Sequence, residues 1–483
     1  MSAPREKADA PPASPADPAV LRRSLDARPF VGVWVPSVVA VIGTGLAVFG
    51  LSWWISRAPD GGAHLGVVVA LASAVSLISV LLLAGVIDSA DRRRTVVTVL
   101  LVLAAPLLAL LYLFGLSPGG TFAVTVGGLC YVLVYSLQQI YMAAVENIGA
   151  DLAPPSWPAA RTALLTQIHP QVARVLAPLA AGALLAYGSL RWVSLVALVC
   201  TLLALAAVPL LAKAVAATPV RKAVPKPVPK LVPKPVPKSV PDRPDSGTRG
   251  SPVSLLRGVW RDAAGSLRLI RSHPELVFLV FFGALGNLIV FPFSAVLPAF
   301  NAEYGLSTSA QAALYSTASS AYGVGMLVGC LVLVRVPPPA GARASLRLAS
   351  IAFALILLVL LVTTIAPWPA TVVLAMAVTG GLFSILVAVG GALWLRLTPA
   401  AIRVRVFSLR RLTVFSTIPV GSMLMGIGGS VFGYRVFIRG MVAFTLVALA
   451  LLWARYRRTA SADLTPPVPT PPVPTPPIPT PPV

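Results

Sequence analysis

Charged residues are scarce in this sequence, and acidic residues are the scarcest. Only 11% of the 483 residues are charged, 15 acids stand against 38 lysines and arginines, and 57% of the residues are hydrophobic. Water-soluble domains carry about a quarter charged residues. The composition therefore excludes a water-soluble domain and indicates a chain that lies mostly within a membrane.

Cysteines are also few. Cys130, Cys200 and Cys330 each lie inside an apolar run and far from one another, which suits neither a close-spaced metal cluster nor an extracellular disulfide framework. We expect three reduced thiols, no metal and no cofactor. No metal-ligand cluster or nucleophile–base pairing stands out in the sequence either, so an integral membrane enzyme is the least favoured class.

The first 28 residues lack a signal peptide. They are polar and rich in proline and alanine, without the apolar core and cleavage site that a signal peptide needs. The net charge of +23 does not indicate nucleic-acid binding, because the basic residues are spread through short loops with few aromatics between them. We expect a disordered cytoplasmic N-terminal tail and no nucleic-acid partner.

Apolar runs of membrane-spanning length are what the chain has in abundance. About 20 apolar residues cross a bilayer as a helix, and roughly twelve such runs appear, which split six and six around a long polar segment. We therefore predict an all-α integral membrane protein. The runs cover residues 31–55, 66–87, 95–116, 122–145, 162–187, 190–212, 276–299, 311–335, 346–366, 370–395, 412–432 and 436–454.

Basic residues concentrate in alternate loops. Short loops rich in arginine and lysine stay on the cytoplasmic side, so this asymmetry places both termini in the cytoplasm of a cell, with the chain in its inner or plasma membrane. Arg435 and Arg439 are the local exception. The basic, even-numbered connections hold Arg92 to Arg94, Arg161, the central segment, Arg335 with Arg343 and Arg347, and Arg396 to Arg411.

These features divide the chain into six parts. The central segment contains a proline–lysine repeat that favours an extended spacer, and an amphipathic helix for the membrane surface or the bundle face follows it. The C-terminal end is a proline-rich repeat without charge. The parts are the tail 1–28, a six-helix half 29–212, the linker 213–252, the surface helix 253–275, a second six-helix half 276–458 and the tail 459–483.

Two six-helix halves with a basic central loop resemble the major facilitator superfamily of transporters, and so does the hairpin GVIDSADRRR between the second and third runs. Asp88, Asp91, Arg92 and Arg93 match the charged positions of the superfamily's hairpin signature, while Ser89 stands where the signature has arginine. The resemblance implies a major facilitator fold and alternating access by rocking of the halves. It also implies a small-molecule substrate, the lipid bilayer as surroundings, and a monomer.

Local strings resemble the bacterial branch that includes the enterobactin exporter. They are QVARVLAPLAAG (171–182), LRLIRSHPELV before the seventh run, AYGVGMLVGC in the eighth and TPAAIRVRVFSL before the eleventh. This resemblance implies efflux of a siderophore-like or drug-like molecule. A nutrient importer of the same fold and a transport-inactive scaffold or sensor that docks partners through its proline-rich tails remain alternatives.

Arg174 is the clearest candidate for a substrate contact. It lies near the middle of the fifth run, where a charge is costly and functional by default. It either attracts an anionic or other substrate in a central cavity, or pairs with backbone carbonyls or a polar neighbour. His169 could couple proton movement to transport, since histidine titrates near neutral pH, although a hydrogen-bonded packing role is preferred. No carboxylate lies at the centre of a run, so proton antiport through a buried acid is not supported.

Polar and small residues inside the runs are further candidates. Amides and hydroxyls can bind substrate or join helices, proline and glycine can bend a helix, and glycines allow close packing. The polar candidates are Tyr135, Gln138, Gln139 and Asn287, the bend candidates are Pro178 and Gly182, and the packing glycines are Gly325, Gly329, Gly380, Gly381, Gly390 and Gly391.

The superfamily resemblance also implies a gate on the cytoplasmic side. In resembling transporters the hairpin aspartate meets the start of the eleventh helix, and the hairpin arginine meets an acid at the end of the fourth. Carried onto this sequence, Asp88 would face the helix that follows Arg403 and Arg405, whose positive end favours an anion. The complete gate set is Asp88, Asp91, Arg92, Arg93, Glu146, Asp151, Arg403 and Arg405.

Overall fold

The apolar runs form long helices in a computed structural model of the chain, which describes residues 28–89, 92–114, 120–152, 159–187, 189–208, 265, 267–336, 338–339, 341–366, 368–398 and 403–462. Within these ranges the regular structure is helical throughout. The helices are α2 (Arg28–Ser56), α3 (Gly61–Ser89), α4 (Arg92–Leu113), α5 (Thr121–Leu152), α6 (Ala159–Tyr187), α7 (Leu190–Ala206), α10 (Pro274–Ala302), α11 (Thr308–Arg335), α12 (Ala342–Ile365), α13 (Ala370–Leu397), α14 (Arg403–Phe415), α15 (Thr417–Phe432) and α16 (Tyr434–Ala462).

The helices reproduce the twelve predicted runs. In the described part of the chain, ten stretches are long and apolar enough to cross a membrane, one of them made by α14 and α15 together. Two shorter apolar stretches, Pro170–Leu185 of α6 and Leu190–Ala206 of α7, complete the set. The prediction of an all-α, multi-pass membrane protein with about twelve spans is therefore confirmed.

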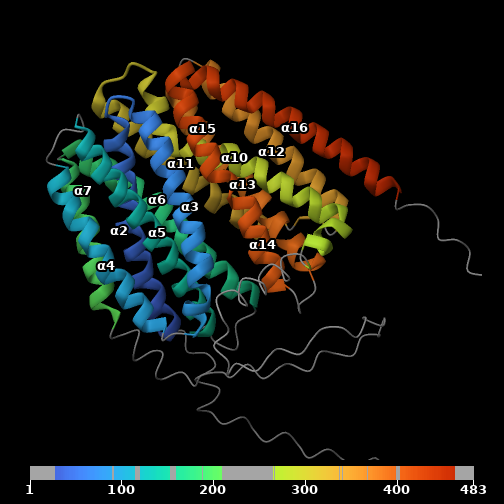
Figure 1. The fold of residues 1–483 in the computed structure, drawn as a ribbon, viewed down its shortest axis with the longest axis horizontal. Helices are drawn as coiled ribbons and strands as arrows, with labels where there is room; N and C mark the ends of the chain where they lie inside the picture. The colour runs from blue at the N-terminus through green and yellow to red at the C-terminus, as the bar shows by residue number, and fades with distance from the viewer. Residues whose placement is uncertain are drawn as a thin grey trace, which may run out of the picture.

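The helices form two bundles that lie side by side. Figure 1 shows α2 to α7, from blue to green, on one side and most of α10 to α16, from yellow to red, on the other, with α11 reaching over the first group at the top. The turns α2–α3, α10–α11 and α15–α16 share one end of the molecule, at the top of the view. We call this end the closed end, because the contacts described below join the two halves there.

Parts of the predicted domain plan lie outside the described residues. These are the N-terminal tail up to residue 27, the linker 213–252 and the chain beyond residue 462. Of the surface helix 253–275, residues 267–272 are helical, with Ile270 buried and Arg268 and Arg271 exposed. That part has the predicted amphipathic character. The last helix, α16, continues four residues past the predicted boundary at 458.

Arg435 and Arg439, the exception to the charge asymmetry, have partners within the second half. The carboxylate of Glu303 accepts hydrogen bonds from the backbone N–H groups of Tyr434 and Arg435, and it lies 3.7 Å from the Arg435 guanidinium. It thereby caps the N-terminus of α16, where a negative charge is favoured. Arg439 donates to the carbonyl of Thr364 at 2.6 Å, close to the end of α12. Both arginines thus stabilise helix ends.

The packing glycines divide into two groups. A Cβ at Gly329 would lie 2.6 Å from the carbonyl oxygen of Gly381, and one at Gly380 would collide with the carbonyl oxygen of Tyr322, so α11 and α13 approach closely there. Gly325 makes a similar approach to Ala377. In contrast, a Cβ at Gly390 or Gly391 would meet no atom within 4 Å. The packing role predicted for these two glycines is wrong, because no described atom of another helix lies against the face of α13 that they occupy.

Candidate functional site

The two halves meet at the closed end through α2 and α11. The Phe49 ring stacks on the Tyr315 ring with centroids 4.1 Å apart, and Trp53 stacks on the same ring at 6.4 Å. Beyond them, Arg57 donates hydrogen bonds to Gln311 at 3.1 Å and to Thr308 at 3.0 Å. Aromatic packing and charged-to-neutral hydrogen bonds therefore join the α2–α3 turn to the start of α11.

A second contact between the halves is made by backbone against backbone. A Cβ added to Gly66 of α3 would lie 2.6 Å from the Cα of Gly426 on α15, and one added to Gly426 would lie 2.5 Å from the Cα of Gly66. Real Cβ atoms do not approach other heavy atoms so closely. Only glycine at both positions permits this crossing, and Gly62 makes a similar close approach to Tyr434.

The third contact joins α6 to α11. Ser316 Oγ donates to the Pro178 carbonyl at 2.7 Å, and Ser320 Oγ donates to the Val175 carbonyl at 3.0 Å. The serine at 316 also occupies the space that a side chain at Gly182 would need. Helix α6 runs continuously past Pro178. The residues predicted to bend this helix thus lie where the opposite half touches it.

Arg174 lies one turn further from the closed end, at the border of this contact. Its side chain is exposed for more than a third of its area, and its guanidinium lies 3.5 Å from the Met326 sulfur on α11. Tyr135 on α5 and Tyr322 on α11 lie within range of its charge, and Gly323, next to Tyr322, packs against the Arg174 backbone. We call Tyr135, Arg174, Tyr322 and Met326, together with Phe383 described next, the interfacial cluster.

Aromatic rings pack next to Tyr322 and Tyr135. The Phe383 ring on α13 lies 6.4 Å from the Tyr322 ring, and Phe291 on α10 packs edge-to-face against Phe383 at 5.5 Å. On the other half, Tyr135 stacks on Tyr131 at 6.2 Å. Each half thus contributes packed aromatic rings, from α5 in the first half and from α10, α11 and α13 in the second.

The Tyr322 hydroxyl has no hydrogen-bond partner in the described structure. Its side chain is only 8% exposed, and the oxygen is fully enclosed. A buried polar group without a partner costs about 1 to 3 kcal/mol. A charge near the middle of a span costs about 2.5 to 3.5 kcal/mol on insertion scales. The cluster therefore contains two polar groups, the Arg174 guanidinium and the Tyr322 hydroxyl, without a strong hydrogen-bond partner among the described residues.

The other predicted polar residues differ in their surroundings. Asn287 is buried, and its amide donates to the Val414 carbonyl at 3.0 Å, so it joins α10 to α14 within one half. That contact supports the alternative role as a helix-joining amide. Gln138 and Gln139 lie half-buried on α5, one turn from Tyr135. His169 lies in α6, with its side chain outside the described structure.

The predicted cytoplasmic gate falls largely outside the described side chains. Helix α14 begins at Arg403 and packs beside α3, which ends next to Asp88. α3 and α14 are the two helices that would have to lie together for the gate predicted from the resemblance. Asp91 is not among the described residues, and the side chains of the remaining seven gate residues are not described. The pairing of the gate residues therefore stays a prediction.

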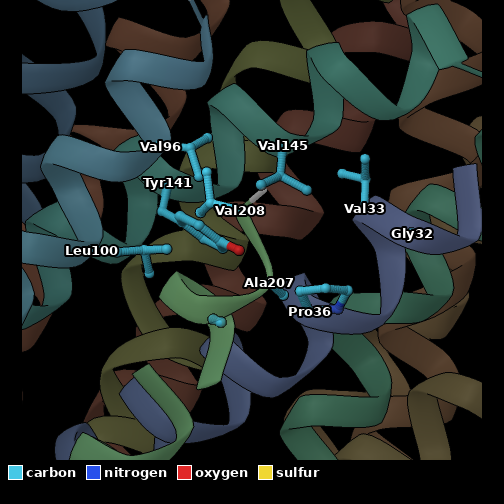
Figure 2. Close-up of a pocket in the computed structure, with 10 residues that line it drawn as sticks. Gly32, Val33, Pro36, Val96, Leu100, Tyr141, Val145, Ala207 and Val208 are labelled. Carbon is cyan, nitrogen blue, oxygen red and sulfur yellow. The ribbon is translucent and has the colours of Figure 1, made fainter. Parts of the chain in front are cut away.

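A small cavity lies inside the first half, away from the cluster. Figure 2 shows side chains of α2, α4 and α5, such as Pro36, Leu100 and Tyr141, around it, together with Val208 after α7. It holds about 20 Å³, is lined mainly by apolar atoms, and offers room for a molecule no larger than water. This cavity is a packing defect between four helices rather than a site for an organic ligand.

Tyr322, Met326 and Phe383 were not predicted as site residues. Aromatic and thioether side chains in an apolar run look like ordinary core residues, and the sequence holds no local signal that brings them to Arg174. The pair Tyr131 and Tyr135, four residues apart on one helix face, was the available signal on the first half.

Two six-helix halves that meet around a central cluster define the major facilitator fold, and comparisons with known proteins agree. Residues 165–363, less than half of the chain, match the family model described as Major Facilitator Superfamily. No curated protein is similar enough in sequence to count as a relative.

Solved structures match over nearly the whole chain. A nucleoside transporter, NupG, is 13% identical and has a TM-score of 0.58, with 89% of this chain and 99% of that chain covered. A POT family transporter in complex with 5-aminolevulinic acid is 10% identical, with a TM-score of 0.62 and coverage of 88% and 96%. A bacterial homologue of the human lysosomal transporter Spinster, inward-facing and unoccupied, is 14% identical, with a TM-score of 0.56 and coverage of 94% and 100%.

These similarities show the fold of the chain. They include nucleoside, peptide and Spinster-type transporters, and the narrower resemblance to the enterobactin-exporter branch stays a prediction.

Proposed function

We propose that this chain is a secondary active transporter of a small organic molecule. The observation that supports this proposal best is the interfacial cluster, because it places an exposed cation and an unpartnered hydroxyl between two halves that have a transporter fold. Substrate in such folds binds near the middle of the membrane, at the boundary between the repeats. Arg174, Tyr135 and Tyr322 are the residues that we assign to substrate binding.

The mechanism we propose is alternating access. The contacts of Arg57, Gly66 and Ser316 close one end of the molecule, and the loop charges assign that end to the outside of the plasma membrane. In this conformation the cluster would open toward the cytoplasm, as in the similar Spinster homologue whose structure is inward-facing and unoccupied. Transport then requires the closed-end contacts to break while the predicted gate around Asp88 forms. A single chain contains both halves, so we propose a monomer.

The favoured direction is efflux, which the local strings shared with the enterobactin-exporter branch support. Import of a nutrient is the alternative within the same fold. Cells that carry the gene or a deletion would be loaded with labelled candidate compounds and the retained label counted. Efflux predicts more label in the deletion strain, import predicts less, and equal label for every candidate would favour a scaffold that does not transport.

The role of Arg174 can be tested by flux. We expect Arg174→Met to lower substrate flux in proteoliposomes at least about tenfold, because a charge-assisted hydrogen bond to substrate is lost. Arg174→Lys should retain part of the flux, since it keeps the charge but loses the planar fork. Arg191→Met, which removes an exposed arginine at the start of α7, is the matched control and should transport normally. Wild-type flux in Arg174→Met would remove this residue from the site.

The cytoplasmic gate is tested by Asp88→Asn. The variant keeps the size of the side chain but loses the charge that would face the positive N-terminus of α14. We expect reduced flux with unchanged expression. His169→Gln is measured beside it under an imposed proton gradient, where loss of the gradient response would support a proton as the coupling ion. Full activity of Asp88→Asn would leave the hairpin as an ordinary basic loop.

A further inference from the structure

The described residues of the interfacial cluster carry a positive charge and no negative charge. Arg174 is the cation, and its direct contact is the Met326 thioether, which is a weak acceptor. Among the described residues no carboxylate pairs with this guanidinium. A cationic ligand would be repelled at this position, while an anionic ligand would supply the strong acceptor that the guanidinium lacks.

A second donor lies on α11, the helix that Arg174 contacts. The Tyr322 hydroxyl is enclosed and unpartnered. Its helix lies against Arg174, because Met326, one turn along α11, contacts the guanidinium and a Cβ at Gly323 would lie 3.1 Å from the Arg174 carbonyl carbon. If the Tyr322 side chain turns toward Arg174, an oxyanion that accepts from both groups would satisfy the orphaned hydroxyl and the charge at once. A neutral amide or alcohol of the same shape would satisfy the hydroxyl but not the charge.

The walls of the cluster indicate the shape of the remainder of the ligand. Phe383 lies next to Tyr322 and Phe291 packs edge-to-face on Phe383, both in the second half, while Tyr135 stacks on Tyr131 in the first half. Aromatic rings favour offset stacking or edge contacts with a planar apolar group. The region between the halves therefore suits a molecule with a flat apolar body and an anionic end.

We propose that the interfacial cluster selects a small organic anion with a planar apolar body, whose oxyanion binds Arg174 and Tyr322. This inference rests on the proposed function and narrows its substrate class. Arg174 lies on α6 and Tyr322 on α11, so one oxyanion bridges the two halves. Binding would then hold the halves together next to the contacts of Ser316 and Ser320.

The test uses three probes that share one ring system: 2-naphthoate (anion), 2-naphthamide (neutral) and 2-naphthylmethylammonium (cation). The purified full chain in nanodiscs is treated with phenylglyoxal, which modifies accessible arginines, and modification is mapped by mass spectrometry. We expect 2-naphthoate to slow modification of Arg174 at concentrations at least about tenfold lower than 2-naphthamide. The cation should give no protection, and Arg191 should react at the same rate throughout.

Variants separate the two donors. Tyr322→Phe removes only the hydroxyl. Protection of Arg174 by 2-naphthoate should be several-fold weaker in this variant than in the wild type, and protection by 2-naphthamide should stay as weak as in the wild type. Binding to Arg174→Met is followed by quenching of tryptophan fluorescence, and there the preference for anion over amide should disappear. Phe281→Leu, at an exposed position of α10, is the control for a ring removed elsewhere.

Three outcomes would overturn the inference: equal protection by amide and anion, protection by the cation, or no protection by any probe. Failure of the proposed function gives a different result. If proteoliposomes show no flux of any compound while 2-naphthoate still protects Arg174 selectively, the anion site is supported and the proposed transport is refuted. If substrate flux is measured but only cationic compounds inhibit it, the proposed transport is supported and the proposed anion site is refuted.

Discussion

At the scale of single residues, the few charges in the described helices have separate tasks. Arg174 faces the boundary between the halves with a thioether as its contact, whereas Arg435 and Glu303 form a pair inside one half. Glu303 also accepts from two backbone N–H groups at the start of α16. Arg174 is therefore available for a ligand, whereas the pair of Arg435 and Glu303 stabilises the start of α16.

This difference predicts a stability effect for Glu303. Glu303→Gln keeps the shape of the side chain but removes the negative charge at the helix N-terminus, which should cost about 1 kcal/mol. We expect the melting temperature of the purified protein to fall by about 1 °C, with binding of 2-naphthoate unchanged. Glu303→Asp keeps the charge and is compared beside it. An unaltered melting temperature in Glu303→Gln would show that the cap contributes nothing measurable.

At the scale of elements, small residues decide which helices approach each other. The crossing of α3 and α15 depends on Gly66 and Gly426, because a side chain on either would collide with the other backbone. The crossing of α6 and α11 uses Ser316 and Ser320, whose hydroxyls bond to carbonyls of the opposite half. Both crossings join the halves, so they govern whether the closed end can form.

A leucine at position 66 tests this dependence. Gly66→Leu should prevent the closed-end contact, since no Cβ fits against the Gly426 backbone, and flux should fall at least about tenfold. Opening is measured by the reactivity of a cysteine at position 57 in a background where Cys130, Cys200 and Cys330 are replaced. Gly390→Ala is the control, because its Cβ meets nothing within 4 Å and alanine favours a helix. Normal flux in Gly66→Leu would mean that this crossing is dispensable.

The helices and the halves could be predicted because hydropathy and loop charge depend on residues near one another in the sequence. The limits of α13, predicted as 370–395 and found as Ala370–Leu397, illustrate this. The cluster could be predicted only in part. Arg174 was visible as a charge in an apolar run, but Tyr322 looks like core until α11 is placed against α6. The prediction for Gly390 was wrong for the same reason: the sequence alone does not show which helix faces lie against each other, and a small residue allows close packing only where a neighbouring helix lies against it.

At the scale of the whole molecule, the two halves are expected to move as rigid bodies about the cluster. The contacts of Arg57 with Gln311 and Thr308 lie at the far closed end, and they would separate most when the outside opens. The cluster lies nearer the centre, where the displacement is smaller. A restraint at the closed end should therefore stop transport without changing the binding residues.

A cross-link provides that restraint. Cysteines at positions 57 and 311, in the background without native cysteines, should be joined by a short bifunctional methanethiosulfonate reagent, and flux should stop until a reductant is added. Protection of Arg174 by 2-naphthoate should persist in the cross-linked protein. Cysteines at 304 and 435, both within the second half, form the control pair, and their cross-link should not affect flux. Continued transport through a joined 57–311 pair would exclude opening at this end.

The described contacts that hold the closed end include no ion pair between the halves. Arg57 bonds to an amide and a hydroxyl, Ser316 and Ser320 bond to carbonyls, and glycine meets glycine between α3 and α15. The Glu303–Arg435 ion pair lies within one half and is not broken when the halves part. Salt weakens exposed ion pairs much more than neutral hydrogen bonds or close packing. The balance between the two conformations should therefore be nearly independent of ionic strength on this side of the membrane.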